Sequence, residues 1–240
     1  AQDGRGGIAT TTISVKVEDP LVDWTQRATG RTTNLLYDVI FAGGKFVAVG
    51  INNTVLTSPD GITWATATFP TGISLTGVAH NGSRYVVSGY RFSNTTQKGL
   101  AAYSENGVTW TTVAIDTGLA QFWGIAHGAG RFVAVGDSGT IYSSVDGSSW
   151  IPSAATGITT SFRSVAYADG LFVAIGDSGR LFTSPDGVTW INRSLATTNS
   201  FNSVVYHDGS WLVRGFNVIY TSPDGIVWSR ATGVNVTNTA

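Results

Sequence analysis

Ser184-Pro185-Asp186-Gly187-Val188-Thr189-Trp190 decides the fold, because nearly the same seven residues close five successive stretches of this chain. The copies end at tryptophans that lie 38 to 46 residues apart, namely Trp64, Trp110, Trp150, Trp190 and Trp228. Short apolar runs separated by Gly, Asn and Asp fill each period. A period of this length with this pattern predicts about four β-strands per repeat.

The third repeat shows the pattern most clearly. Residues 122–127 and 131–136 predict two strands joined by a Gly-Ala-Gly turn, a third strand follows at 140–144, and the fourth begins at 149–153. The same register fits all five repeats. The sequence therefore predicts an all-β fold, a five-bladed β-propeller of four-stranded antiparallel blades, with residues 21–240 as the propeller and residues 1–20 as an N-terminal extension that contains an extra strand.

The repeated segment carries its own turn chemistry. Its third residue is an acid or an amide that can accept backbone N–H bonds, and the glycine after it supplies a positive φ. These third residues are Asp60, Asn106, Asp146, Asp186 and Asp224. We expect the tryptophan that ends each segment to be buried between neighbouring sheets.

On these residues the chain resembles the β-propellers built from Asp-box-type repeats, which occur in sialidases and in bacterial and phage surface proteins. The resemblance covers roughly residues 20–235 and implies a propeller. It departs from the family pattern in one respect, because Asp and Gly are adjacent here, as in Asp60-Gly61, whereas the Asp-box has a residue between them.

Composition excludes several classes of function. The formal net charge is −1 with 12% charged residues, so we expect neither nucleic-acid binding nor membrane insertion. The chain has no Cys, which excludes disulfides and thiolate metal sites, and nothing in it calls for a cofactor. It also has no Met. We therefore expect either that Ala1 results from processing, as in a secreted protein of the cell surface, or that the chain is a piece of a larger one.

The residues that could suggest catalysis fall at repeat positions. His80 and His127 stand where other repeats have Phe41 and Tyr167, which indicates that they pack in the blades or line a central channel. Arg84 and Arg131 recur after the first turn, which is typical of solvated hairpin positions. The sequence shows no carboxylate pair, arginine cluster or activated nucleophile of the kind a glycosidase needs. We therefore expect that the protein is not an enzyme.

One stretch, Tyr90–Gly99, is longer than its counterparts in the other repeats. Its residues Tyr90, Arg91 and Phe92 offer stacking area and hydrogen bonds together, so they form a candidate binding loop. A tolerated surface insertion is the alternative interpretation.

The N-terminal region holds a surplus of strands. Residues 22–28 nearly match residues 226–232, so there are six copies of the fourth strand for five blades. Residues 8–18 are rich in Thr and Val and resemble the last strand of an Ig-like or cadherin-like domain. They either lie along a blade edge of the same molecule or, with Ile13, Val15 and Val17 setting the register, add to a blade edge of a neighbouring subunit.

The sequence favours a structural or adhesive interaction module, with other copies of itself or surface proteins as partners. Assembly into a fibre through the N-terminal strand is its most specific form. The alternative is a glycan-binding protein similar to the five-bladed lectins of the tachylectin type. A lectin with one pocket per blade should repeat its polar and aromatic residues, and the loops of this chain differ from blade to blade.

Overall fold

The computed structural model describes residues 32–70, 72–93, 96–115, 118, 120–153 and 159–232. The predicted N-terminal strand with Ile13, Val15 and Val17, and the surplus strand copy around Trp24, lie outside the described residues and stay predictions.

Five sheets, called blades 1 to 5 here, follow one another along the chain. Blade 1 comprises β1 (Leu36–Ala42), β2 (Lys45–Gly50), β3 (Val55–Ser58) and β4 (Ala65–Thr66). Blade 2 comprises β5 (Ile73–His80), β6 (Tyr85–Ser93), β7 (Thr96–Ser104) and β8 (Thr111–Ala114). Blade 3 comprises β9 (Phe122–Gly128), β10 (Arg131–Gly136), β11 (Ile141–Ser144) and β12 (Ile151–Pro152), with the 3-10 turn η1 (Asp137–Gly139) after β10. Blade 4 comprises β13 (Phe162–Ala168), β14 (Leu171–Gly176), β15 (Leu181–Ser184) and β16 (Ile191–Asn192). Blade 5 comprises β17 (Phe201–His207), β18 (Ser210–Gly215), β19 (Val218–Ser222) and β20 (Ser229–Arg230).

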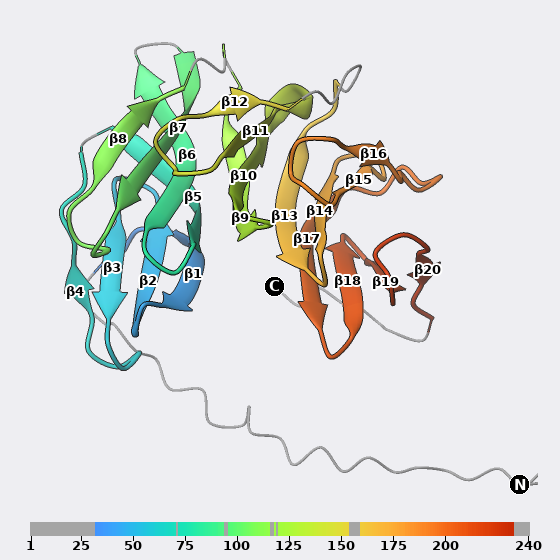
Figure 1. The fold of residues 1–240 in the computed structure, drawn as a ribbon, viewed down its shortest axis with the longest axis horizontal. Helices are drawn as coiled ribbons and strands as arrows, with labels where there is room; N and C mark the ends of the chain where they lie inside the picture. Colours follow the sequence, from blue (N-terminus) through green and yellow to red (C-terminus); the bar gives the residue numbers. More distant parts are fainter. Residues whose placement is uncertain are drawn as a thin grey trace, which may run out of the picture.

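Each blade is an antiparallel meander in which every strand pairs with the next one along the chain. The same pairing register recurs, as in Phe132↔Ser144 of blade 3 and Phe172↔Ser184 of blade 4. The five blades follow one another around an arc, and the first strands of successive blades contact each other (Figure 1). The predicted five-bladed β-propeller of four-stranded antiparallel blades is confirmed.

Four hydrophobic cores join the blades in pairs. The core between blades 3 and 4 is typical, because Val133, Val135 and Ile141 of blade 3 pack against Phe162 and Phe172 of blade 4. Equivalent cores join blades 1 and 2, blades 2 and 3, and blades 4 and 5. Along the second strands of blades 2 to 4, one side chain is thus buried toward the preceding blade and the next toward the following blade, as the two-residue period of a strand requires.

In a closed ring of five blades, blade 5 would pack against blade 1. Within the described residues no hydrophobic core joins blade 5 to blade 1. Blade 1, in blue and cyan, and blade 5, in orange and red, stand at the two ends of the arc (Figure 1).

The stretch predicted as a protruding loop in the second repeat is instead a continuation of two strands. β6 and β7 pair from Tyr85↔Ser104 to Ser93↔Thr96, which makes this hairpin longer than its counterparts. Arg91 and Lys98 are cross-strand partners near its end. Among the described residues, no helix has the length and apolar character that crossing a membrane requires.

The cores should dominate stability. Phe172 is fully buried between blades 3 and 4, whereas Ile191 on the outer strand β16 is exposed. We expect Phe172→Ala to lower the free energy of unfolding by about 3–5 kcal/mol, because it leaves a cavity in a packed joint. The control Ile191→Ala should change it by less than about 0.5 kcal/mol. Urea unfolding of both variants checks this, and equal losses would contradict the assignment of the core.

Candidate functional site

The repeated segment forms a turn held by one serine and one acid. In blade 4, Ser184 Oγ donates to Asp186 Oδ1 at 2.9 Å and accepts the N–H of Gly187 at 2.8 Å. Asp186 Oδ1 also accepts the N–H groups of Val188 and Thr189, both at 2.8 Å. The hydrogen bond from Thr189, followed by that from Val188, outweighs burial and lowers the pKa of Asp186 below its ordinary value.

The same hydrogen bonds recur in the other four copies, so the predicted turn chemistry is present in every blade. The acceptors at the third position are Asp60, Asn106, Asp146, Asp186 and Asp224. In each copy the glycine has a φ between 70° and 75°. Asn106 makes these bonds with an amide oxygen, which shows that the turn needs an acceptor and does not need a charge.

The glycine of this turn touches the preceding blade. A Cβ added to Gly147 of blade 3 would lie 2.5 Å from Val86 Cγ2 of blade 2, and one added to Gly187 of blade 4 would lie 2.7 Å from Val133 Cγ2 of blade 3. Gly107 approaches Val47 in the same way, and Gly225 approaches Leu171. The turn is therefore the joint between blades, and only glycine fits both its φ and its close contact.

The motif tryptophans lie beside these joints, where they are partly buried. Trp110, Trp150, Trp190 and Trp228 pack against the four inter-blade cores, and Trp64 packs against Phe46 of its own blade. In three blades the indole N–H explains the orientation, because Trp64, Trp150 and Trp228 donate it to the carbonyl of the motif glycine at 3.0–3.1 Å. This bond holds the ring over the turn at the rim of the core.

The cations after the first turn also belong to the joints. Arg84 donates to the carbonyl of Asp146 in the next blade at 2.6 Å, and its guanidinium lies over the ring of Tyr103, 4.3 Å from the centroid. Lys45 donates to the carbonyl of Asn106 at 3.0 Å. The interpretation of Arg84 as a solvated hairpin residue is therefore wrong, because this side chain reaches the motif turn of the following blade.

We expect the motif to tolerate a neutral acceptor. Asp186→Asn should change the free energy of unfolding by less than about 0.5 kcal/mol, because Asn106 makes the same bonds in blade 2. Asp186→Ala should lower it by about 1–2 kcal/mol, since three donors lose their acceptor. Urea unfolding at neutral pH measures both, and an Asn variant as unstable as the Ala variant would show that charge is the important property.

A group of polar and aromatic side chains lies where the second strands end; we call it the channel-mouth cluster and define it as Tyr90, Trp123, Asp137, Arg163 and Asp177. Trp123 Nε1 donates to Asp137 Oδ1 at 2.7 Å, and the ring of Tyr90 packs against that of Trp123 with centroids 5.8 Å apart. Arg163 makes a bidentate pair with Asp177, with contacts of 3.1 and 2.8 Å, and its guanidinium lies 5.5 Å from the Trp123 ring centroid.

This cluster joins blades 2, 3 and 4 through side chains of their inner strands and adjoining turns. The hydrogen bond from Asp177 outweighs burial and raises the pKa of the Arg163 guanidinium above its ordinary value. The sequence analysis did not predict this cluster. The sequence did contain a signal for it. Only the third and fourth repeats have an acid, Asp137 or Asp177, directly after the glycine that ends the second strand, and the same repeats have Trp123 and Arg163 on their first strands.

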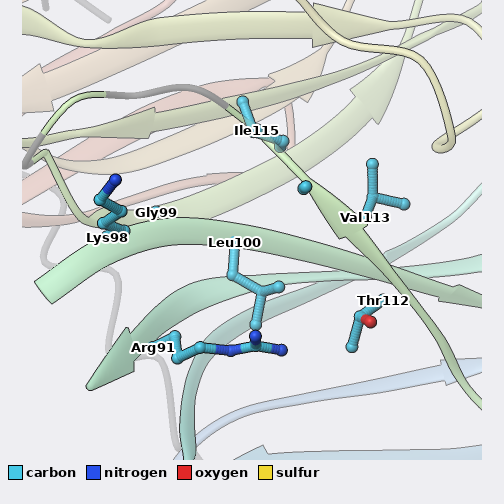
Figure 2. A pocket seen from close by; sticks show the side chains of 8 residues that line it. Arg91, Lys98, Gly99, Leu100, Thr112, Val113 and Ile115 are labelled. Carbon is cyan, nitrogen blue, oxygen red and sulfur yellow. The ribbon is translucent and has the colours of Figure 1, made fainter. Parts of the chain in front are cut away.

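The extended hairpin of blade 2 borders a cavity of about 510 Å³. Arg91 and Lys98 supply cations to its wall, and Leu100, Val113 and Ile115 supply apolar surface. Figure 2 shows the side chains of Arg91 and Leu100 pointing toward one another. Of the predicted binding loop, Arg91 is exposed and lines this cavity, Tyr90 is buried in the channel-mouth cluster, and the side chain of Phe92 lies outside the described residues.

The two repeat-position histidines pack as predicted. His80 lies against Tyr85 with ring centroids 4.2 Å apart, and His127 lies against Phe132 at 4.7 Å, as Tyr167 does against Phe172 at 4.5 Å. Burial lowers the pKa of His80. Burial, followed by the charge of His80, lowers the pKa of His127. Within the described part of the chain, no group of three or more His, Asp or Glu residues is placed to hold a metal ion.

These histidines should make the fold sensitive to mild acid. Because their folded-state pKa values lie below the ordinary value of 6.5, the unfolded chain binds more protons, and the free energy of unfolding falls as the pH drops below about 6.5. We expect the double variant His80→Phe with His127→Tyr, which uses the residues of equivalent positions, to lose this dependence between about pH 7 and 5. Urea unfolding across that range tests it, and an unchanged slope in the variant would contradict the assignment.

Comparison with known proteins identifies the fold and no family. No family model matches the chain, and no curated protein sequence does. Solved structures are similar in fold. YCF48 bound to D1 peptide is 19% identical with a TM-score of 0.61, over 82% of this chain and 68% of that chain. The WD40 beta propeller domain of Doa1 is 13% identical with a TM-score of 0.58, over 79% and 65%.

Virginiamycin B lyase from Staphylococcus aureus is 10% identical with a TM-score of 0.66, over 82% of this chain and 69% of that chain. At these identities the likeness concerns the propeller fold alone.

Proposed function

We propose that this chain is a non-enzymatic interaction module that works outside the cell in a structural or adhesive role. The channel-mouth cluster is the observation that carries this proposal. It presents aromatic and charged groups at one end of the blades, and those groups are fixed by bonds to one another, as in Trp123 with Asp137 and Arg163 with Asp177. A rigid, mixed surface of this kind suits recognition of a partner more than turnover of a substrate.

The acids of the cluster support the non-enzymatic part. Asp137 accepts hydrogen bonds from Trp123 and Ser161, and Asp177 pairs with Arg163, so each carboxylate already has partners in the folded chain. A general acid or base needs a group that can exchange its proton with a substrate. Turnover of a sialoside or another glycoside by the purified protein would contradict this part of the proposal.

A glycan-binding role is the alternative, and the repeat positions speak against it. The first strand of each blade carries a Leu or Phe, and the residue that follows it differs in every blade. These residues are Tyr37, Thr76, Trp123, Arg163 and Asn202. A lectin that binds one glycan per blade would need the same polar and aromatic set at each mouth. The variation favours one extended partner that spans several blades.

Assembly of copies into a fibre is the finer form of this role. The described chain starts at Thr32, just before β1, so residues 8–18 are joined to the arc at blade 1, one of its two ends. A strand rich in Thr and Val that is tethered at this end can add to a blade edge of a neighbouring copy. Ile13, Val15 and Val17 would then fix the register through their shared face.

We expect the intact chain to form fibres or oligomers, and the chain without residues 1–19 to stay folded and monomeric at the same concentration. Negative-stain microscopy and sedimentation measure this. The double variant Val15→Asp with Val17→Asp should behave like the deletion. Thr12→Asp with Ser14→Asp, which adds the same charge to other positions, is the control. An intact chain that is monomeric at high concentration would contradict strand-mediated assembly.

A further inference from the structure

Blade 1 exposes the side that the other four blades bury. Leu36 and Val39 of β1 are 46% and 56% exposed. The residues at the position of Leu36 in the other blades are 0% exposed, and those at the position of Val39 are 4–7% exposed. They are Leu75, Phe122, Phe162 and Phe201 for the first position and Val78, Ile125, Val165 and Val204 for the second. Phe46 is half-buried, whereas its counterparts Tyr85, Phe132, Phe172 and Trp211 are at most 2% exposed.

This open side of blade 1 is apolar and hollowed. A groove of about 300 Å³ runs along it, lined by Leu36, Tyr37, Asp38, Val39, Ala48 and Trp64. The Asp38 carboxylate accepts the N–H of Val78 in blade 2 at 2.9 Å. Exposed apolar residues gathered in this way mark an interaction surface.

The repeat shows what covers such a side. At the joint of blades 3 and 4, the side with Phe162 is covered by Val133 and Val135 of the second strand and by Ile141 of the third strand of the preceding blade. Blade 1 covers blade 2 with Val47, Val49 and Val55, and blade 4 covers blade 5 with Val173, Ile175 and Leu181. In each internal joint, the side of a blade that faces the following blade does the covering, and we call it the outward side. The open side of blade 1 therefore fits the outward side of a blade of this kind.

Blade 5 is the blade whose outward side, among the described residues, has no other blade packed on it. Leu212 holds the position of Val133, and Ile219 holds that of Ile141; both are half-buried. Val205, at the position of Ala126, is 46% exposed. Blade 5 thus keeps the apolar character of a covering side.

We propose that the open side of blade 1 docks on the outward side of blade 5 of a second copy of this chain. The two sides stand at opposite ends of the arc (Figure 1). Closing the ring within one chain would require all four joints to change their angle together, and packed joints resist such change. A second copy supplies the missing side with no rearrangement, in a head-to-tail contact.

The contact deepens the assembly part of the proposed function, because it places the neighbouring copy against the end of the arc from which residues 1–31 depart. The strand of residues 8–18 is then tethered beside the copy that it would join. Two weak contacts held together in this way reinforce each other through effective concentration.

Arg214 makes this contact weaker than the internal joints. It is exposed and stands where blades 1, 3 and 4 have the fully buried Val49, Val135 and Ile175. A cation brought against an apolar side without an acidic partner loses hydration. The contact is therefore reversible, and replacing this arginine by the residue of the equivalent positions should tighten it.

Cross-linking tests the proposal directly, because the chain has no cysteine. We expect Val39→Cys protein mixed with Leu212→Cys protein to give a cross-linked dimer with a short bis-maleimide, since the equivalent Val78 and Val47 share one core. Val39→Cys mixed with Ile151→Cys, on the exposed outer strand β12, is the control. If the double variant Val39→Cys with Leu212→Cys cross-links only within single chains, the ring closes on itself and the proposal is overturned.

Point variants give a second readout by sedimentation of the intact chain. Val39→Lys should weaken association about tenfold or more, because the contact would bury a second unpaired cation beside Arg214, and Ile151→Lys should leave association unchanged. Arg214→Val should strengthen association. Equal association of all three variants and the parent would overturn the proposal, and circular dichroism confirms that each is folded.

The same cross-linking in the chain without residues 1–19 separates the two parts of the assembly. A Val39–Leu212 cross-link between copies at raised concentration supports the blade contact even if the N-terminal strand plays no part. Its absence there and in the intact chain, with fibres still present, would leave the strand as the assembling element and overturn the blade contact.

Discussion

The hydrogen bonds that one serine and one acid make within each seven-residue turn determine how every blade sits on the blade before it. They hold the motif glycine at a positive φ, and this brings its Cα against a side chain of the preceding blade, as Gly147 against Val86 and Gly187 against Val133. The turn that closes one sheet is therefore also the surface that joins it to its neighbour. Cations such as Arg84, which reach the carbonyl of the next motif turn, add a polar bond to the same joint.

The two sides of this joint are different, because a motif turn contacts the blade before it and not the blade after it. This asymmetry explains why the two ends of the molecule differ. The motif turns of blades 2 to 5 each contact the preceding blade. Among the described residues, the turn of blade 1 has no blade to contact, and no turn covers the outward side of blade 5. At blade 1 the apolar residues of the joint are retained but exposed, as Val39 shows. At blade 5 one of them is replaced by Arg214. An exposed end that keeps the residues of a joint is the physical basis for inferring that copies associate.

The repeat made the fold predictable from the sequence, because strands, turns and register recur with the motif and each copy reinforces the others. The turn bonds of Asp186 and the packing of His127 followed from local chemistry and repeat position alone. Features that depend on how blades meet could not be read in this way. The contact of the Arg163 guanidinium with the Trp123 ring and the bond of Arg84 to the carbonyl of Asp146 each link two different blades. The partial burial of the tryptophans and the open arc likewise depend on the angle between sheets, which no single repeat specifies.

Two glycine substitutions test most directly whether the motif turn is a joint between blades. Gly61 and Gly147 have nearly the same φ, 71° and 75°, so alanine at either should cost about 1–2 kcal/mol of backbone strain. Among the described residues, only Gly147 of the two has a preceding blade, and a Cβ there would lie 2.5 Å from Val86 Cγ2, whereas one at Gly61 would lie 3.3 Å from Phe46 Cε2 of its own blade. The free energy of unfolding, measured with urea, should therefore fall further for Gly147→Ala than for Gly61→Ala, by about 1–3 kcal/mol. Equal losses in the two variants would show that the turn shapes each blade by itself and does not join it to the one before.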